Sequence, residues 1–164
     1  MENPINEAVI DLPISDKKGE WSNQYAERLE EASIVLQTCN RIASKISTLK
    51  SLANRNIYTL DVYEQVNELV RFTPKALLAL KEYDSATSER DKIDAITKVQ
   101  KLTSEFKSLR KQFEHIYGKT RILTKPENYI LDQDHHSHLA NQALSFDWQF
   151  YAEILFLEKI KKLF

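Results

Sequence analysis

The feature that most limits the fold of this chain is a series of apolar residues at steps of three and four, which persists for more than thirty residues from Trp21. At 3.6 residues per turn, such steps bring the apolar side chains to one side of an α-helix. The spacing predicts a first helix that begins near Glu20, ends near Asn54 and Asn56, and is about 50 Å long at 1.5 Å per residue. Its apolar positions are Trp21, Tyr25, Leu29, Ala32, Val35, Leu36, Cys39, Ile42, Ala43, Ile46, Leu49 and Leu52.

Length and composition also favour helices in a single domain. The chain has 164 residues, only two glycines, Gly19 and Gly118, and four prolines. This length suits one hydrophobic core, whereas an all-β fold would need many more turn residues. We therefore expect one helical domain over 1–164, with residues 1–19 as an extended N-terminal strap and residues 20–164 as a helical bundle. The lone Cys39 lies on the inward side of the first predicted helix, so we expect a buried, unreactive thiol.

A second helix is predicted to begin around Thr59–Asp61, and its continuation past Thr73-Pro74 has two interpretations. Threonine is a good N-cap and proline fits a first helical position, so a new helix could begin at Pro74. A single helix with a kink at the proline is the alternative. The spacing places a further set of apolar residues on the buried side of this helix: Val62, Tyr63, Val66, Leu69 and Val70.

A third helix is predicted after Ser88, which forms a start like a capping box with Asp91. Gly118 follows its last apolar residues, at a position where a left-handed residue commonly ends a helix. His115 lies within this helix, and we interpret it as structural. The apolar side of the helix comprises Ile93, Ile96, Val99, Leu102, Phe106, Leu109, Phe113, Ile116 and Tyr117.

The remaining sequence predicts an irregular loop and then a final helix. Pro126 interrupts any helix through the residues before it, and a helix is expected to resume between Asp134 and Ser145 and to run almost to Phe164. The chain is therefore predicted to be all-α, an elongated bundle of about four long helices. Because apolar residues surround the last helix, it must be buried on more than one side. Either the other three helices wrap it, or another domain or subunit covers it.

The loop and the start of the last helix hold the residues with the most distinctive chemistry. Asp132, Asp134, His135, His136 and His138 are metal-ligand types at close spacing. However, no HExxH motif, cysteine pair or EF-hand pattern accompanies them. Side chains of these types more commonly cap a helix and satisfy loop backbone groups, so we predict no metal.

Other patterns exclude several functions. Two glycines are too few for a phosphate-binding loop or a nucleophile elbow, so no cofactor and no independent catalysis are expected. The 23 basic and 24 acidic residues are interspersed, which argues against nucleic acid and membrane surfaces as partners. No apolar run reaches the roughly 18 residues of a membrane span, and the N-terminus does not have the pattern of a signal peptide. The mature product of an exported precursor would look the same, so the compartment stays open.

Several short motifs, spread from about Ala8 to the end of the chain, resemble one known family. They are Val9-Ile10-Asp11-Leu12-Pro13, Gly19-Glu20-Trp21-Ser22, Tyr25-Ala26-Glu27-Arg28-Leu29, Phe113-Glu114 through Tyr117, Thr120-Arg121, the block from Pro126 to Gln142 (PENYILDQDHHSHLANQ) and Asp147-Trp148. Together they are similar to the helical C-terminal region of bacterial glycoside hydrolase family 20 proteins, the β-N-acetylhexosaminidase-like enzymes. The block from Pro126 is the most specific part.

The resemblance implies a supporting function. Catalysis in that family belongs to a (β/α)8 barrel, whose adjacent Asp-Glu pair works with the acetamido group of the substrate. This chain has no Asp-Glu dipeptide and is too short for a barrel, so no catalytic residue carries over. The resemblance implies a non-catalytic accessory domain that packs on a separate barrel. Its candidate contacts with the barrel or with a sugar are Arg121, Tyr129, Asp132, Asp134, His135, His136, His138, Asn141 and Trp148.

Two other functions stay open. The chain could be an independent helical interaction module or a homodimer, with the apolar last helix as its seam. A metal-dependent activity centred on the histidines is the third and weakest alternative.

Overall fold

The computed structural model describes residues 11–13, 16–120 and 156–160. Within this part of the chain every regular element is a helix, which confirms the predicted all-α class. The labelled helices are α1 (Glu20–Gln24), α2 (Ala26–Leu52), α3 (Ile57–Ser85) and α4 (Glu89–Tyr117). Residues 156–160 are also helical, and the rest of the predicted last helix lies outside the described residues.

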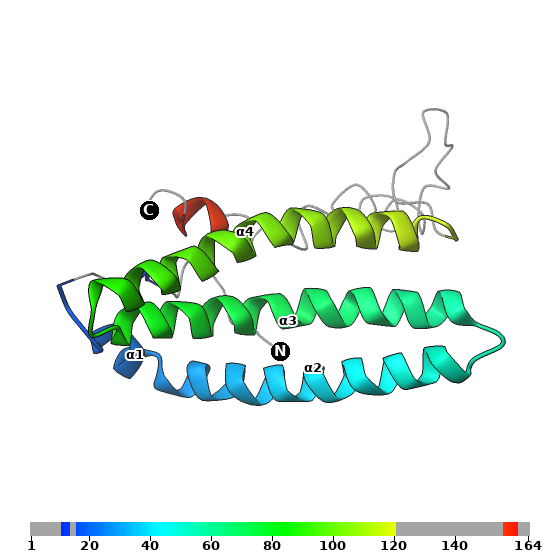
Figure 1. The fold of residues 1–164 in the computed structure, drawn as a ribbon, viewed down its shortest axis with the longest axis horizontal. Coiled ribbons are helices and arrows are strands. Elements are labelled where there is room, and N and C mark those ends of the chain that lie inside the picture. The colour runs from blue at the N-terminus through cyan, green and yellow to red at the C-terminus, as the bar shows by residue number, and fades with distance from the viewer. Residues whose placement is uncertain (1–10, 14–15, 121–155, 161–164) are drawn as a thin grey trace, which may run out of the picture.

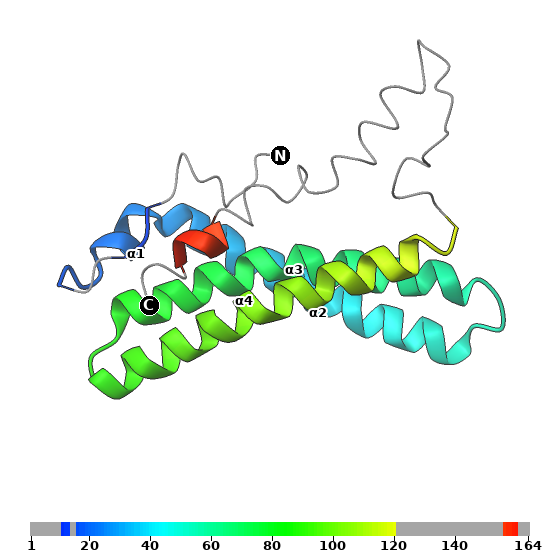
Figure 2. The same cartoon turned by 90° about the horizontal axis from the view of Figure 1, so that it is seen from above.

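The three long helices lie side by side, with α3 in the middle (Figure 1). Helix α3 packs along both α2 and α4, whereas α2 and α4 share no comparable contact. Turns reverse the chain at opposite ends, so that neighbouring helices are antiparallel. Seen from above, α1 lies at the end of the bundle where α3 meets α4, and the helical residues 156–160 lie at this end too (Figure 2). The long helices therefore form a layer with two broad faces, rather than a closed bundle.

The predicted first helix is two helices, because the chain breaks at Tyr25. This residue has φ −107° and ψ 25°, outside the helical region, so one continuous helix from Glu20 was wrong. The break coincides with contacts to the N-terminal strap. The Asp11 N–H donates to the Tyr25 hydroxyl at 3.0 Å, and the Trp21 indole N–H donates to the Asp11 carbonyl. Residues 11–13 have no regular structure, as expected of a strap, and Leu12 is buried.

The predicted end of α2, start of α4 and end of α4 at Gly118 are confirmed, although the conformation of Gly118 is not. Helix α2 ends at Leu52, before the turn in which Asn56 adopts a left-handed conformation at φ 61°. Asparagine tolerates that conformation better than most residues. The Ser88 hydroxyl caps α4 by accepting the Asp91 N–H at 3.1 Å. Gly118 is not left-handed, contrary to prediction: its φ is −65°, and the Lys119 and Thr120 N–H groups donate to carbonyls three residues back, which tightens the last turn instead.

Pro74 lies inside a continuous helix. Helix α3 runs unbroken from Ile57 to Ser85, so no new helix begins at the proline. Proline has no N–H to donate to the carbonyl of Val70, four residues earlier. Val70 lies on an exposed side of α3, where water can reach its backbone, whereas Pro74 itself is buried in the next turn. Burial of the ring therefore offsets the lost hydrogen bond.

The hydrophobic core is concentrated at the end of the layer where α1, the strap and residues 156–160 pack on the long helices. The Phe72 and Phe106 rings join α3 to α4, with centroids 4.7 Å apart. The core includes residues far apart in sequence: Leu12, Trp21, Tyr25, Leu29, Phe72, Leu77, Leu80, Val99, Phe106, Phe156, Leu157 and Ile160. The N-terminal strap and residues 156–160 therefore complete one core with the long helices.

We predict that Phe72→Ala lowers the free energy of unfolding by about 3–5 kcal/mol, because it removes a large ring that is only 1% exposed and leaves a cavity. Urea denaturation followed by circular dichroism measures the change. Ile93→Ala is the matched control, since Ile93 is 59% exposed and its truncation should change stability by less than about 0.5 kcal/mol. Equal effects of the two substitutions would contradict this location of the core.

We predict that Ser88→Ala lowers the free energy of unfolding by about 1 kcal/mol, since it removes the cap of α4. The Ser88 hydroxyl also donates to the Asp91 carboxylate, and this bond holds the pKa of the carboxyl below its ordinary value, so the part of the contribution that comes from it exists when the carboxylate is ionised. It is lost as the pH falls through the lowered pKa. The effect of the substitution should therefore be largest near neutral pH and shrink in acid. An NMR titration of Asp91 should show its pKa rising in the variant.

Candidate functional site

The residues predicted to contact a barrel or a sugar lie outside the described part of the chain. They are Arg121, Tyr129, Asp132, Asp134, His135, His136, His138, Asn141 and Trp148. Within the described residues, no group of three or more histidine, cysteine, aspartate or glutamate side chains could hold a metal ion. His115 is exposed in the last turn of α4. The two faces of the helical layer are the described surfaces on which a site could lie.

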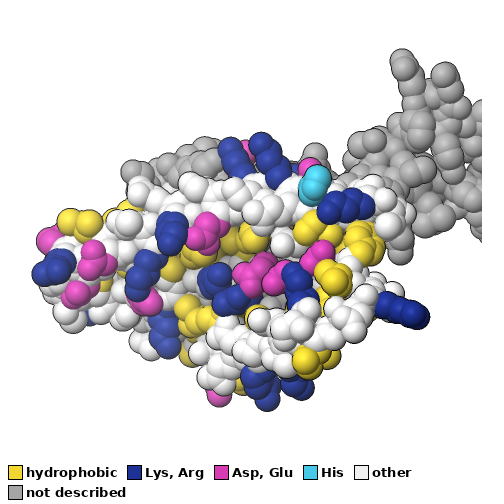
Figure 3. All heavy atoms as spheres, turned by 45° about the vertical axis from the view of Figure 1, so that its right-hand side comes forward, with side chains coloured by type: hydrophobic (Ala, Val, Ile, Leu, Met, Phe, Trp, Pro, Cys, Tyr) yellow, Lys and Arg dark blue, Asp and Glu magenta, His cyan; other side chains and the backbone are white. Residues whose placement is uncertain are grey.

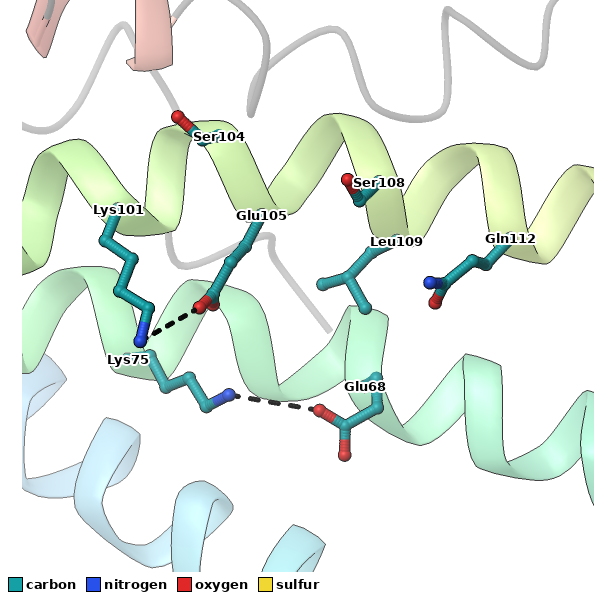
Figure 4. A pocket seen from close by; sticks show the side chains of 8 residues that line it. All are labelled: Glu68, Lys75, Lys101, Ser104, Glu105, Ser108, Leu109 and Gln112. Atoms are coloured by element: carbon teal, nitrogen blue, oxygen red, sulfur yellow. Dashed lines mark ion pairs between the residues drawn. The ribbon is translucent and has the colours of Figure 1, made fainter.

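One face carries a polar groove of about 500 Å³ between α3 and α4 (Figure 4). Its charged side chains are paired: Lys75 lies 3.9 Å from Glu68, and Lys101 lies 3.8 Å from Glu105. Glu68 also pairs with Arg71. These ion pairs leave none of the groove's four charged side chains without an opposite charge. The groove lining is Glu68, Lys75, Lys101, Ser104, Glu105, Ser108, Leu109 and Gln112.

The pairing of charges continues along this face, where acidic and basic side chains lie side by side (Figure 3). Lys50 of α2 is 2.7 Å from Asp61 and 2.8 Å from Glu64 of α3. Hydrogen bonds to these two carboxylates raise the pKa of the Lys50 ammonium group. A general acid or base needs a carboxyl or amine whose proton is lost near neutral pH. A charge-paired, solvated face does not offer one, so we interpret this face as structural.

The opposite face of the layer is apolar, and part of it is not covered by any residue that the structure describes. On α3 it carries Tyr63, Val66 and Val70, which are 61%, 40% and 49% exposed. At 100° per residue these three share one side of α3, opposite Glu68 and Lys75. The prediction that they are buried was therefore wrong. The spacing correctly identified an apolar side of the helix, but spacing does not report whether another element covers that side.

Helix α2 extends the same apolar surface. Lys50 reaches Asp61 and Glu64 on the charge-paired side of the seam between α2 and α3. Around α2 in the other direction, Ile42 and Leu49 lie beyond the buried Ile46, and they are 40% and 52% exposed. They therefore fall on the same side of the hairpin as the exposed residues of α3. We call the five residues Ile42, Leu49, Tyr63, Val66 and Val70 the α2–α3 apolar face.

This face is a continuation of the core. One and two turns after Val70, the same side of α3 carries Pro74 and Leu77, both buried. Leu77 belongs to the core that Leu12, Trp21 and residues 156–160 complete. Among the described residues, one side of a single helix is therefore buried along its C-terminal half and exposed along its N-terminal half. Contiguous exposed apolar surface of this kind commonly marks an interaction site.

A second polar feature lies at the covered end. The Asp84 carboxylate on α3 accepts the Ser22 N–H through Oδ2 at 2.8 Å. The backbone carbonyl of Asp84 accepts the Gly19 N–H at 3.1 Å. The carboxylate thus caps the positive end of α1 from 62 residues away. It borders a pocket of about 220 Å³ that also includes Lys18 and Lys92. Because both of its hydrogen bonds join α1 to α3, we interpret Asp84 as a structural residue.

Cys39 is buried, as predicted, on the side of α2 that faces α3. The Asn67 side-chain amide donates to its backbone carbonyl at 3.1 Å, which fixes the two helices relative to one another. Burial raises the pKa of the Cys39 thiol, so little of the nucleophilic thiolate forms. The thiol therefore has the environment of a packing residue and not that of a nucleophile.

Comparisons with known proteins found no matching family, no curated relative and no similar solved structure. The resemblance to glycoside hydrolase family 20 proteins therefore stays a prediction. Fold and surface together define a class: an all-α helical layer with one charge-paired face and one partly uncovered apolar face. Among the described helices, none is long and apolar enough to cross a lipid bilayer.

We predict that Asp84→Ala separates α1 from α3, because it removes the acceptor of the Ser22 N–H. The free energy of unfolding should fall by about 1–2 kcal/mol, the range for a lost cap or buried hydrogen bond. Trp21, which is 4% exposed in α1, should become accessible to a fluorescence quencher below the unfolding transition. The tryptophans should be followed in a Trp148→Phe background, so that Trp21 is the only reporter. An unchanged quenching constant would contradict the capping role.

Proposed function

We propose that this chain is a non-catalytic helical accessory domain, which packs against a separate catalytic barrel of a glycoside hydrolase family 20-like protein. The observation that carries the packing role is the α2–α3 apolar face. Burial of apolar surface is favourable by about 25 cal/mol per Å², so a partner surface that covers these side chains would gain stability. The resemblance of the sequence motifs supplies the identity of the partner.

The chemistry of the described residues agrees with a supporting role. The charged residues of the groove between α3 and α4 are held in ion pairs, and the single thiol is buried. In this proposal the residues that shape the mouth of the barrel's sugar site are those of the resembling block, above all Tyr129, His135 and Trp148. Aromatic faces suit the apolar face of a sugar ring, and aspartate, histidine and asparagine side chains suit its hydroxyls.

A stand-alone homodimer is the second candidate. The same apolar face favours it, since a second copy of the chain could also cover that face. Sedimentation of the purified chain separates the two candidates: a concentration-dependent dimer supports the second, and a monomer that associates with a barrel-containing polypeptide supports the first.

We predict that the isolated chain does not cleave a chromogenic N-acetyl-β-hexosaminide, whereas a parent polypeptide that includes the barrel does. Joined to the barrel, the chain should also show weaker acrylamide quenching of tryptophan fluorescence, because the surroundings of Trp148 become buried. Trp21 contributes little to the change, since it is already 4% exposed. Hydrolysis by the isolated chain, or quenching that the barrel leaves unchanged, would contradict the proposal.

A further inference from the structure

We propose that the α2–α3 apolar face, together with Arg41 and Lys45 along its edge, binds an amphipathic helix of the partner whose apolar stripe is bordered by carboxylates. This inference rests on the proposed function, and it specifies which surface makes the contact and what chemistry it recognises. It differs from the contacts implied by the family resemblance, which involve residues 121–148.

The shape of the face suits a helix. Tyr63, Val66 and Val70 repeat at steps of three and four along α3, and Ile42 and Leu49 are seven residues apart on α2. Each row extends about 10 Å at 1.5 Å per residue, or two helical turns. Two such rows on antiparallel helices leave a groove into which the side chains of a third helix can pack. The anchors of the bound helix would then follow the i, i+3, i+7 pattern of helix-in-groove recognition.

The charge along the edge selects an acidic partner. Arg41 and Lys45 are both exposed, one turn apart on the outer side of α2, beside Ile42 and Leu49. Within the described part of the chain neither forms an ion pair, whereas Lys50, Arg71 and Lys75 all do. Two carboxylates one turn apart on a bound helix would lie at the spacing of these two cations. Uncompensated positive charge beside an apolar groove therefore favours an apolar, acidic segment.

The other possible occupants fit less well. A second copy docked through the same face would bring its own Arg41 and Lys45 toward these two cations, and Glu64 and Glu68 on the facing stretch of α3 already pair with Lys50 and Arg71. The five residues of the face are 40–61% exposed, and none of the residues that the structure describes covers them. An external acidic helix satisfies both the apolar and the charged parts of the surface.

The test uses the full chain and a fluorescein-labelled synthetic helix of about five turns, with leucines on one stripe and glutamates along one border. The matched probe has lysines in place of the glutamates. Anisotropy titrations at low salt should show the glutamate probe binding about tenfold more tightly, since two ion pairs replace two like-charge contacts. The preference should shrink as salt is added. The double variant Arg41→Glu with Lys45→Glu should reverse the preference.

The apolar part is tested by the double variant Val66→Gln with Val70→Gln, which should weaken binding of the glutamate probe at least tenfold. Glutamine has a higher helix propensity than valine, so α3 should stay folded, as circular dichroism would verify. Ile93→Gln is the matched control, because Ile93 is similarly exposed but lies on α4. It should leave binding unchanged.

Four outcomes would overturn the inference: no binding of the glutamate probe, equal binding of the two probes, insensitivity to the valine substitutions, or a dimer of the chain that these substitutions dissociate. The same experiments distinguish failure of this inference from failure of the proposed function. If the chain associates with a barrel-containing polypeptide and the valine substitutions leave that association intact, the docking surface is wrong and the accessory role stands. If the probe binds as expected but no barrel associates, the surface stands and the accessory role fails.

Discussion

The structure depends on the burial of α3, the middle helix of a single layer. With α2 on one side and α4 on the other, α3 still presents two broad faces to its surroundings. A helix of this length gains most of its stability from packing rather than from intrinsic propensity. The side chains on each face must therefore be either hydrated or buried. On one face, ion pairs such as those of Lys50 and Lys75 allow contact with water. On the other, apolar side chains need cover.

The described residues supply cover at one end of that second face. There α1, the strap residue Leu12 and residues 156–160 close a core around Leu77 and Trp21. The Asp84 carboxylate fixes this cover by capping α1, and the break at Tyr25 lets α1 turn away from α2. Toward the turn between α2 and α3, the same face continues, and its apolar side chains are exposed among the described residues. The boundary between the two halves falls near Pro74, where the helix lacks one hydrogen bond.

This division into two faces determines which side chains the described part of the chain presents to a partner. Paired charges lower the reactivity of the groove between α3 and α4, and burial does the same for Cys39. On the opposite face, exposed apolar residues lie beside Arg41 and Lys45, for which the described part of the chain provides no ion pair. Such a surface can bind but has no group placed to transfer a proton or attack a bond. This surface is the basis of the accessory and docking roles that we propose.

The sequence alone determined the helices. Steps of three and four fixed the apolar sides of α2, α3 and α4, and local chemistry fixed the Ser88 cap and the end of α2 before Asn56. Only the tertiary structure decided what covers those sides. Tyr63, Val66 and Val70 have the same spacing as buried residues, and the Asp84 contact joins residues 62 apart, so no local pattern could report either. Periodicity is a property of one helix, whereas burial is a property of its neighbours.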